Sequence, residues 1–237
     1  DPYLISTPAQ FLEIKDNPDK YYRLTADLDM TGKPWTTLVS LGYSSPGLTL
    51  DGDGHIVSNL VITASGGSSD RISGMFTKTK SYPATFKDIV FEDPVLSGSG
   101  ATNSAGSTSH MALLVPKESG TGDLTFERVG IVNGTLTMTS GYSDASLQRN
   151  GLFLGYSSAK HVYFKNCFAT GTIKSNSDSW RMTAGGFACG IHPDTKKTLE
   201  DCYVDVAIIN PMQKGAFFGG SVQPVAKGVS FFNSAQA

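Results

Sequence analysis

A short pattern of apolar and polar positions recurs through most of the chain. Around Cys167, an apolar residue is followed by two polar or bend-forming residues, and then by apolar residues at Cys167 and two positions later. Taking the central apolar residue of each copy as its marker, the well-fitting copies have markers at Leu60, Ile89, Val129, Cys167 and Cys202, and a partial copy has one at Phe232. Successive markers lie 29 to 40 residues apart. Constant strands separated by loops of unequal length would give this spacing.

A second repeated segment, in which a small residue precedes apolar residues, lies between the markers. Its copies are Gly74–Phe76, Ala112–Leu114, Gly151–Phe153, Gly186–Ala188 and Ala216–Phe218. Each repeat therefore contains at least two strands, and the two segments keep in step along the chain. Parallel strands in register place like residues above one another, ~4.8 Å apart. We predict an all-β fold, a right-handed parallel β-helix of about five to six coils, with the hand following from the crossover rule for parallel strands.

A polar residue stands at the bend before each marker. These residues are Asn59, Asp88, Arg128, Asn166 and Asp201. Asn and Asp tolerate the left-handed backbone that a sharp bend requires, so only Arg128 is unexpected there. One position earlier the charges alternate in sign along Lys87, Glu127, Lys165 and Glu200. We expect these side chains to pair between coils, which would favour the register more than the stability.

The N-terminal segment predicts a cap for the column. Thr7-Pro-Ala-Gln10 is a capping-box pattern with proline at the first helical position, and it predicts a short helix over Pro8–Ile14. Such a helix would cover backbone groups that an open coil leaves unpaired. We therefore expect a single β-helix domain over residues 1–237, with residues 1–20 as the cap and residues 21–237 as the coils. The segment Gly228–Ala237 begins another coil and stops, which favours a piece of a longer surface protein.

Composition excludes several functional classes. The net charge is −2, with 17% charged and 39% hydrophobic residues, which is typical of neither a nucleic-acid-binding nor a membrane-inserting chain. Cys167, Cys189 and Cys202 are odd in number and show no metal-ligand spacing, so we expect buried free thiols and no cofactor or metal. Asp51-Gly-Asp-Gly-His55 resembles part of a calcium loop but lacks the remaining acidic ligands, and it is better interpreted as a tight turn between Leu48–Leu50 and Ile56–Ile62.

Several longer segments resemble a known group of proteins. The segments Tyr21–Trp35 and Leu48–Ile62, followed by the recurring GMF, NGLFLG, GGFACG and FKNCFATGTI motifs, are similar to bacterial surface proteins with GLUG-type repeats. That group includes β-helical regions of some immunoglobulin-A-cleaving peptidases. The resemblance covers most of the chain from Tyr21 on, and it implies an exported, host-associated bacterial protein at the cell surface or outside the cell. The repeats here are degenerate, and no metallopeptidase motif follows.

Loops that leave equivalent positions of neighbouring coils carry the candidate binding residues. They are Tyr142, Asp144, Arg149, Asn176, Asp178, Trp180 and Arg181. Aromatic rings that stack on sugar C–H groups, with polar neighbours that bond hydroxyls, would form a glycan-binding platform. An alternative is that Trp180 and Tyr142 fold back to cover the column.

The sequence leaves more than one function open. The first hypothesis is a non-catalytic, adhesin-like surface module that binds host or dietary glycans or a host surface protein, and a purely structural spacer is not separable from it. The alternative is a polysaccharide lyase or glycoside hydrolase, which would require paired carboxylates on one face. The candidate acids, which include Asp88, Glu92, Glu127 and Asp205, alternate with Lys and Arg instead, so we assign no catalytic residue and favour a protein that is not an enzyme.

Overall fold

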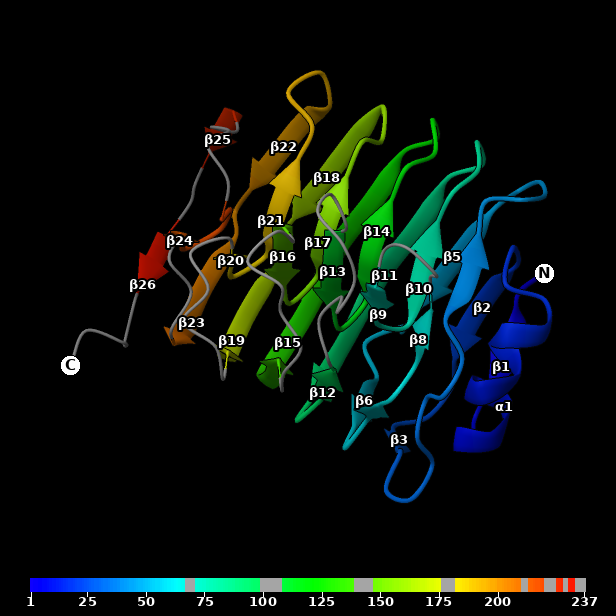
Figure 1. The fold of residues 1–237 in the computed structure, drawn as a ribbon. Helices are drawn as coiled ribbons and strands as arrows, with labels where there is room; N and C mark the ends of the chain where they lie inside the picture. The colour runs from blue at the N-terminus through cyan, green and yellow to red at the C-terminus, as the bar shows by residue number, and fades with distance from the viewer. Residues whose placement is uncertain are drawn as a thin grey trace.

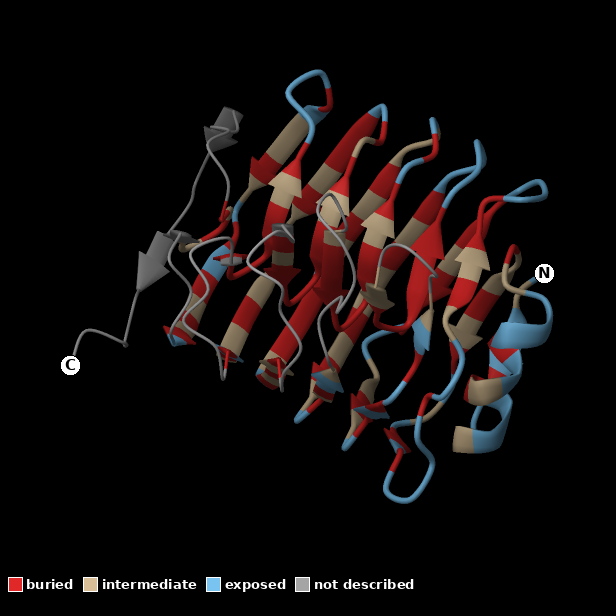
Figure 2. Ribbon diagram, in the orientation of Figure 1, coloured by how far each residue is buried: buried red, intermediate tan, exposed pale blue. Residues whose placement is uncertain are grey.

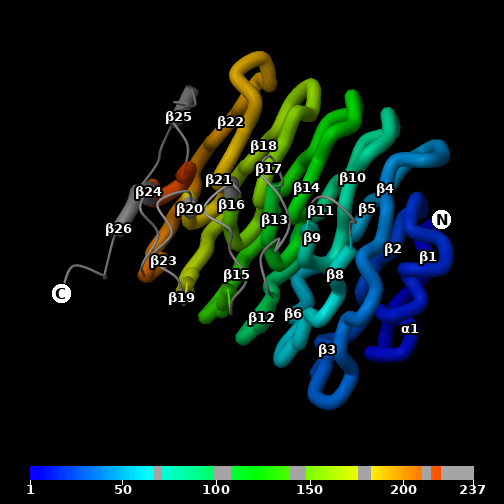
Figure 3. Tube along the Cα trace, in the orientation of Figure 1, coloured from blue at the N-terminus to red at the C-terminus, as the bar shows by residue number. Residues whose placement is uncertain are grey.

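The structure, a computed structural model, describes residues 1–66, 71–98, 108–138, 147–175, 182–209, 213–219, 225–227 and 230–232. The strands wind around one column and form the right-handed parallel β-helix that the sequence predicts (Figure 1). In Figures 1 and 3 the chain ascends through the near strands, crosses over and descends through the far sheet while advancing from its N-terminal end, which is a right-handed path.

Three sheets form the walls of the column. Sheet A contains β1 (Tyr3–Ile5), β2 (Tyr21–Leu24), β3 (Leu28–Asp29), β5 (Leu48–Asp51), β6 (Ile56–Ser58), β7 (Val61–Ile62), β11 (Ala84–Glu92), β12 (Val95–Gly98), β15 (Leu124–Met138), β18 (His161–Lys165), β19 (Phe168–Ser175), β22 (Lys196–Glu200), β23 (Tyr203–Ile209), β25 (Val225–Lys227) and β26 (Ser230–Phe232). Sheet B contains β4 (Val39–Leu41), β10 (Phe76–Lys78), β14 (Val115–Glu118), β17 (Leu154–Ser157) and β21 (Ala188–Ile191). Sheet C contains β8 (Ser65–Gly66), β9 (Arg71–Ser73), β13 (Thr108–Ala112), β16 (Leu147–Gly151), β20 (Met182–Gly185) and β24 (Gln213–Gly215).

Neighbouring coils pair in parallel and in register. Within the described residues β8 and β9 make the one antiparallel pair. The longest match joins β11 to β15, from Ala84 opposite Leu124 to Glu92 opposite Val132. All three sheets contribute to about four turns, and partial coils extend the column at its ends.

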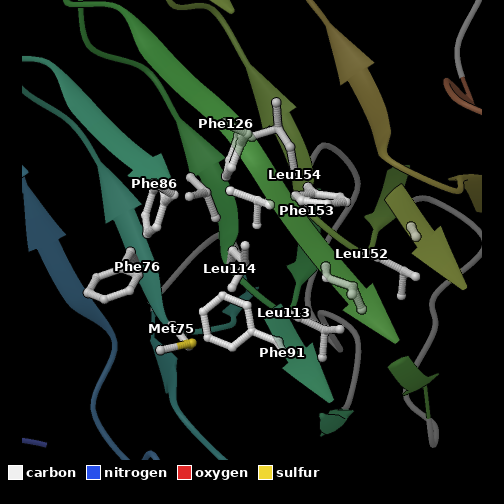
Figure 4. Packing of buried hydrophobic residues seen from close by; sticks show 14 of the residues in the cluster. Met75, Phe76, Phe86, Phe91, Leu113, Leu114, Phe126, Leu152, Phe153 and Leu154 are labelled. Carbon is white, nitrogen blue, oxygen red and sulfur yellow. The ribbon is translucent and has the colours of Figure 1, made fainter. Parts of the chain in front are cut away.

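Aromatic residues fill the interior of the column. Phe86, Phe126 and Phe164 stack face to face along sheet A, with ring centroids 5.2 and 5.0 Å apart. Phenylalanines at or just before the start of the sheet B strands pack against them at an angle, and Phe153 meets Phe126 edge-on at 5.4 Å (Figure 4). The buried residues lie along the strands while most exposed residues lie at loop tips and on the cap (Figure 2). The repeat therefore gives a continuous stack of apolar side chains, because each inward residue lies above its equivalent in the next coil.

The bends adopt the predicted left-handed backbone. The φ angles are 52° at Asp88, 52° at Arg128, 51° at Asn166 and 49° at Asp201. Arg128 occupies this conformation although arginine rarely does, and its guanidinium pairs with both Asp88 and Glu127. A carboxylate or amide is therefore not required at this bend.

The N-terminal cap also forms as predicted. Helix α1 covers Pro8–Leu12 and continues as the 3-10 helix η1, Glu13–Asp16. Thr7 Oγ1 accepts a hydrogen bond from Gln10 N at 3.3 Å, and Gln10 Oε1 accepts one from Ser6 N at 2.8 Å. Phe11 is fully buried, and its ring lies 5.7 Å from that of Trp35. The helix thus closes the end of the apolar column.

One of the marker residues, which were expected to stack above one another inside the column, lies elsewhere. Ile89 pairs with Val129, and the register continues through Cys167 and Cys202, all of them buried. Leu60 is buried too, but it belongs to the next bend, because Val57 pairs with Phe91 and Val61 with Val95. The place beside Ile89 is taken by Gly52, where an added Cβ would lie only 2.5 Å from Ile89 Cβ. The marker Leu60 was therefore assigned to the wrong bend.

The second repeated segment is also displaced by one position in its last two copies, Gly186–Ala188 and Ala216–Phe218. Gly151 pairs with Gly185, and Phe153 N donates to Phe187 O, so Phe187 and not Ala188 matches Phe153. The two adjacent glycines, Gly185 and Gly186, make either alignment acceptable from sequence alone. Within the described residues, no helix has the length and apolar character needed to cross a bilayer.

Candidate functional site

Most of the residues expected to bind a glycan lie outside the described residues. This applies to Tyr142, Asp144, Asn176, Asp178, Trp180 and Arg181. Arg149 is described. It lies on β16 and points out of the column, opposite His110 in the neighbouring strand β13.

The Arg149 side chain, on sheet C, packs against Tyr156, on sheet B. Its guanidinium carbon lies 4.3 Å from the ring centroid of Tyr156, and the His110 ring lies 5.5 Å from the same centroid. An added Cβ on Gly190 would approach Arg149 Cδ to 2.9 Å, so the glycine leaves room for the arginine stem. The Tyr156 ring is thus flanked by other side chains rather than offered to a sugar.

Charged side chains of alternating sign form a row across the outer face of sheet A. The register places them opposite one another in the order Arg23, Asp51, Lys87, Glu127, Lys165 and Glu200. The predicted order in register is confirmed, and it extends further toward the N-terminus than the sequence pattern indicated. Such alternation disfavours stacking in which a coil is paired with the next coil but one, because like charges would then lie opposite one another.

The ion pairs in this row are not all the expected ones. Lys87 Nζ lies 2.9 Å from Asp51 Oδ2, while Glu127 pairs with the neighbouring Arg128 at 2.6 Å. Within the described residues, no ion pair joins Lys165 to Glu127 or to Glu200. The expectation of pairing along the whole row was therefore wrong, because Arg128 offers Glu127 a nearer cation.

Asp51 is the buried anchor of this row. It is 2% exposed and accepts hydrogen bonds from Tyr21, from Arg23 and from the Asp53 N–H. Burial alone would raise its pKa, but the bonds from Lys87, Tyr21 and Asp53 together hold the pKa below the ordinary value. The Asp51–His55 segment is thus the predicted structural turn. The described residues contain no group of three or more His, Cys, Asp or Glu side chains placed to hold a metal.

Two outward tyrosines in sheet A are flanked by cations. The Tyr163 ring stacks on His161, with centroids 3.5 Å apart, and Lys165 Nζ lies 5.6 Å from its centroid. His161 Nε2 lies 2.9 Å from Thr198 Oγ1, and burial together with Lys196 lowers the pKa of His161. Tyr21 lies between Arg23 and Lys87 in a similar way. Both tyrosine rings are therefore partly occupied by their own neighbours.

A different row of outward residues is largely apolar. We call it the outer strip, and it consists of Ile56, Val90, Gly130, Phe168 and Tyr203, which pair successively from β6 to β23. Tyr203 is 36% exposed and Phe168 is partly exposed. The outer strip presents adjacent aromatic side chains on the flat wall of the column.

Phe168 lies flat because its partner has no side chain. An added Cβ on Gly130 would lie 2.3 Å from Phe168 Cζ and 2.5 Å from Cε1, so the ring covers the backbone of β15 at this point. The Phe168 side chain is partly exposed in this position. Tyr203 is the partner of Phe168 in the next strand, about 4.8 Å away across the sheet. Stacking on the C–H groups of a sugar requires an aromatic face of this kind.

Polar side chains border the outer strip. Asn166 and Asp201 are exposed at the bend on one side. On the other side Thr170 Oγ1 accepts a hydrogen bond from Asn133 N at 2.9 Å, and one carboxylate oxygen of its strand partner Asp205 is buried. The exposed amide and carboxylate of Asn166 and Asp201 can hydrogen-bond sugar hydroxyls. The outer strip thus combines the two kinds of contact that a carbohydrate site needs.

The other titratable groups near the column are engaged in the fold. Lys78 and Glu118 are both 0% exposed, with Lys78 Nζ 3.5 Å from Glu118 Oε1, and Ser157 Oγ donates to Glu118 Oε2 at 2.8 Å. Burial lowers the pKa of Lys78 and raises that of Glu118. Cys167, Cys189 and Cys202 are free and buried, as predicted, and burial raises the pKa of Cys189 to about 11. These groups stabilise the column and are closed to substrate.

The acids considered for catalysis are tied to cations or spread apart. Asp88 and Glu127 both pair with Arg128, and Asp205 stands opposite Thr170. Glycoside hydrolysis needs two carboxyl groups that face one substrate, whereas these two face the same guanidinium. The described arrangement therefore does not favour the hydrolase alternative.

Comparison with known proteins supports the fold. No protein-family model matches the chain, and no curated protein matches it. The chain is similar to the crystal structure of a "putative immunoglobulin A1 protease" from Bacteroides ovatus, with a TM-score of 0.56 and 15% identity over 98% of this chain and 74% of that one. At this identity the likeness establishes the shared β-solenoid fold alone. No family match supports the assignment of GLUG-type repeats.

Sequence reasoning missed the outer strip. Phe168 and Tyr203 each follow an inward cysteine, so they read as part of an apolar run rather than as outward residues. The signal that could have found them is the glycine at position 130 in the preceding copy, since a missing side chain opposite an aromatic one indicates a ring laid across the strand.

Proposed function

We propose that this chain is a non-catalytic module of an exported bacterial surface protein, and that its outer strip binds a glycan chain. The observation that carries the proposal is the Phe168 ring, which covers Gly130 on the outer side of sheet A and is partly exposed. Rings in this position contribute little to the closed apolar column, whose interior is filled from the opposite side of the strands. A ligand with apolar ring faces and hydroxyls matches the aromatic row and its polar borders.

The proposed ligand lies across the strands. Successive coils offer an aromatic position at Phe168 and again at Tyr203, so consecutive sugar units of a polysaccharide can meet equivalent contacts. Asn166 and Asp201 are equivalent bend residues in the same two coils, and they would bond hydroxyls along one edge of the chain. A repeating scaffold thus suits a repeating ligand.

Export and surface location are part of the proposal. They are supported by the resemblance to bacterial surface repeats and by a fold shared with a Bacteroides protein whose name describes a protease acting on an immunoglobulin. The activity in that name is not transferred to this chain, because the likeness extends to the fold and the chain spans only 74% of that protein.

Binding to immobilised host and dietary polysaccharides tests the proposal. We expect Phe168→Ser and Tyr203→Ser each to weaken retention about fivefold, which corresponds to the ~1 kcal/mol of an aromatic contact. Tyr43→Ser is the matched control, because Tyr43 is 60% exposed and lies outside the outer strip. Equal retention of all three variants, or no retention of the unmodified chain by any polysaccharide, would overturn the proposal.

A further variant separates the outer strip from the loops. Trp180→Ala removes the aromatic residue on which the sequence-based site depends. If Trp180→Ala abolishes retention while the two variants of the outer strip bind normally, the glycan site lies on the loops and the outer strip is not the site. We also expect no ultraviolet absorbance from unsaturated products when acidic polysaccharides are incubated with the chain.

A further inference from the structure

A hollow beside the N-terminal cap forms a second candidate site, at the end of the column near the label N in Figure 1. It has a volume of about 420 Å³, within the range of small-molecule sites, ~300–1,000 Å³. Its walls come from β1, from the α1–η1 segment and from β2. The lining residues are Tyr3, Leu4, Ile5, Gln10, Glu13, Asp16, Asn17 and Tyr22.

Two tyrosine rings form the aromatic wall of the hollow. The rings of Tyr3 and Tyr22 have centroids 5.6 Å apart and planes inclined by 38°. Tyr22 is 7% exposed, and its hydroxyl donates to Asn17 O at 2.6 Å, which fixes the ring. Tyr3 is 58% exposed. Burial, together with Tyr3 and Asp16, raises the pKa of Tyr22, so its phenol stays protonated at neutral pH.

Carboxylates form the polar wall. Glu13 and Asp16 lie on η1, and the lining includes no basic side chain. Lys15 pairs with Asp16 at 2.9 Å, but both side chains are exposed and such a pair is weak. The hollow therefore carries negative charge next to aromatic rings.

The geometry points to a binding site for an alkylammonium group in this hollow, between the rings of Tyr3 and Tyr22 and the carboxylates of Glu13 and Asp16. A cation is attracted to the face of an aromatic ring and, more strongly, to a nearby carboxylate. Leu4 and Ile5 also line the hollow. An anion would be repelled by these carboxylates.

The same chemistry could come from a quaternary headgroup or from a lysine side chain. Choline chloride represents the first source and Nα-acetyl-lysine methylamide the second. The neutral analogue 3,3-dimethylbutan-1-ol has the shape of choline without its charge, so it separates attraction of the cation from simple burial of methyl groups. Titration calorimetry with each compound, repeated at raised salt, gives the affinities.

Two variants and two matched controls locate the binding. Tyr3→Ala and Glu13→Gln should each weaken cation binding about threefold to fivefold, since one ring contact or one nearby charge is removed. Tyr43→Ala and Asp194→Asn remove an exposed tyrosine and an exposed carboxylate elsewhere and should leave binding unchanged. Circular dichroism checks that each variant keeps its fold.

The outcomes decide the proposal. The proposal is supported if choline or the lysine derivative binds saturably, if both variants and salt weaken this binding, and if the neutral analogue does not bind. The cation that binds more tightly then identifies the source of the ligand. No saturable binding of either cation, or binding that neither variant weakens, overturns it. Tyr203 lies outside the hollow, so Tyr203→Ser should leave cation binding unchanged. The cation proposal and the glycan proposal are therefore tested independently.

Discussion

The ring of Phe168 lies across the backbone of Gly130 in the preceding coil, where a β-carbon would come within 2.3 Å of the ring. The contact joins two strands that are far apart in sequence, and it sets the orientation of an aromatic side chain outside the core. The glycine acts here through the side chain that it lacks, because its backbone needs no unusual φ angle.

Gly130→Ala tests this relationship. The new methyl group meets the far end of the Phe168 ring, which can rotate away into solvent, so we expect the free energy of unfolding to change by less than about 1 kcal/mol. Glycan retention should fall as far as it does in Phe168→Ser, because the ring no longer lies flat. Urea denaturation and the retention assay measure the two effects, and Thr85→Ala on the same outer face is the control. Retention equal to that of the unmodified chain would contradict the account.

Arg128 carries a prediction about the bend. Its φ of 52° costs a residue with a side chain about 1–2 kcal/mol relative to glycine. Both Arg128→Gly and Arg128→Ala remove the ion pairs with Asp88 and Glu127. The difference in stability between the two variants therefore measures the conformational cost of the positive φ at this position. We expect Arg128→Gly to be more stable than Arg128→Ala by about 1 kcal/mol in urea denaturation, the reverse of the usual order in a strand. Equal stability would mean that the bend is not strained.

The repeat phase was predictable because bends and strands leave local signals. Asp88, Asn166 and Asp201 each precede a buried apolar residue, and alternation marks the strands on both sides. Leu60 was misplaced because a second bend has the same signal, as φ values of 58° at Asn59 and 53° at Asn133 show. Telling the two bends apart requires the register between coils, which a single copy does not contain.

The candidate site was less predictable than the fold. Arg149 was expected to bind a ligand, yet it lies over Tyr156, which only the folding of sheet C against sheet B reveals. Phe168 and Gly130 are 38 positions apart, and nothing local marks them as partners. The hollow at Tyr3 and Tyr22 likewise depends on how the cap settles on the column. Sites of this kind depend on how individual side chains pack between coils, whereas the repeat pattern gives only which positions stack.

The buried pair of Lys78 and Glu118 should be costly to break. Lys78→Met leaves the Glu118 carboxylate inside the column without a cation, and we expect a loss of about 3–5 kcal/mol. Lys78→Met combined with Glu118→Leu removes both charges and should recover more than half of that loss. Urea denaturation of the two variants measures the difference. A combined variant that is no more stable than Lys78→Met would show that the pair does not act as a unit.

Asp51 predicts a dependence of stability on pH. Its pKa in the folded chain lies below the ordinary 3.8, so its charge stabilises the fold above that pH, and the contribution is lost as the pH falls through the folded pKa. Asp51→Asn should therefore cost about 2 kcal/mol near neutral pH and progressively less as the pH falls below 3.8. Asp53→Asn, an exposed residue of the same turn, should show no such change. A cost for Asp51→Asn that is constant with pH would contradict the assignment.

Disulfide formation between introduced cysteines tests the register of the coils most directly. Thr85 and Thr125 are partners in neighbouring strands on the outer face, so their Cα atoms are about 4.8 Å apart and Thr85→Cys with Thr125→Cys should cross-link under mild oxidation. Thr85→Cys with Glu127→Cys is displaced by two residues along the strand, to roughly 8 Å, and should not cross-link. Peptide mass spectrometry after proteolysis distinguishes the products from links to the native cysteines. A cross-link in the displaced pair without one in the aligned pair would show that the coils stack in another register, and the outer strip would not exist as described.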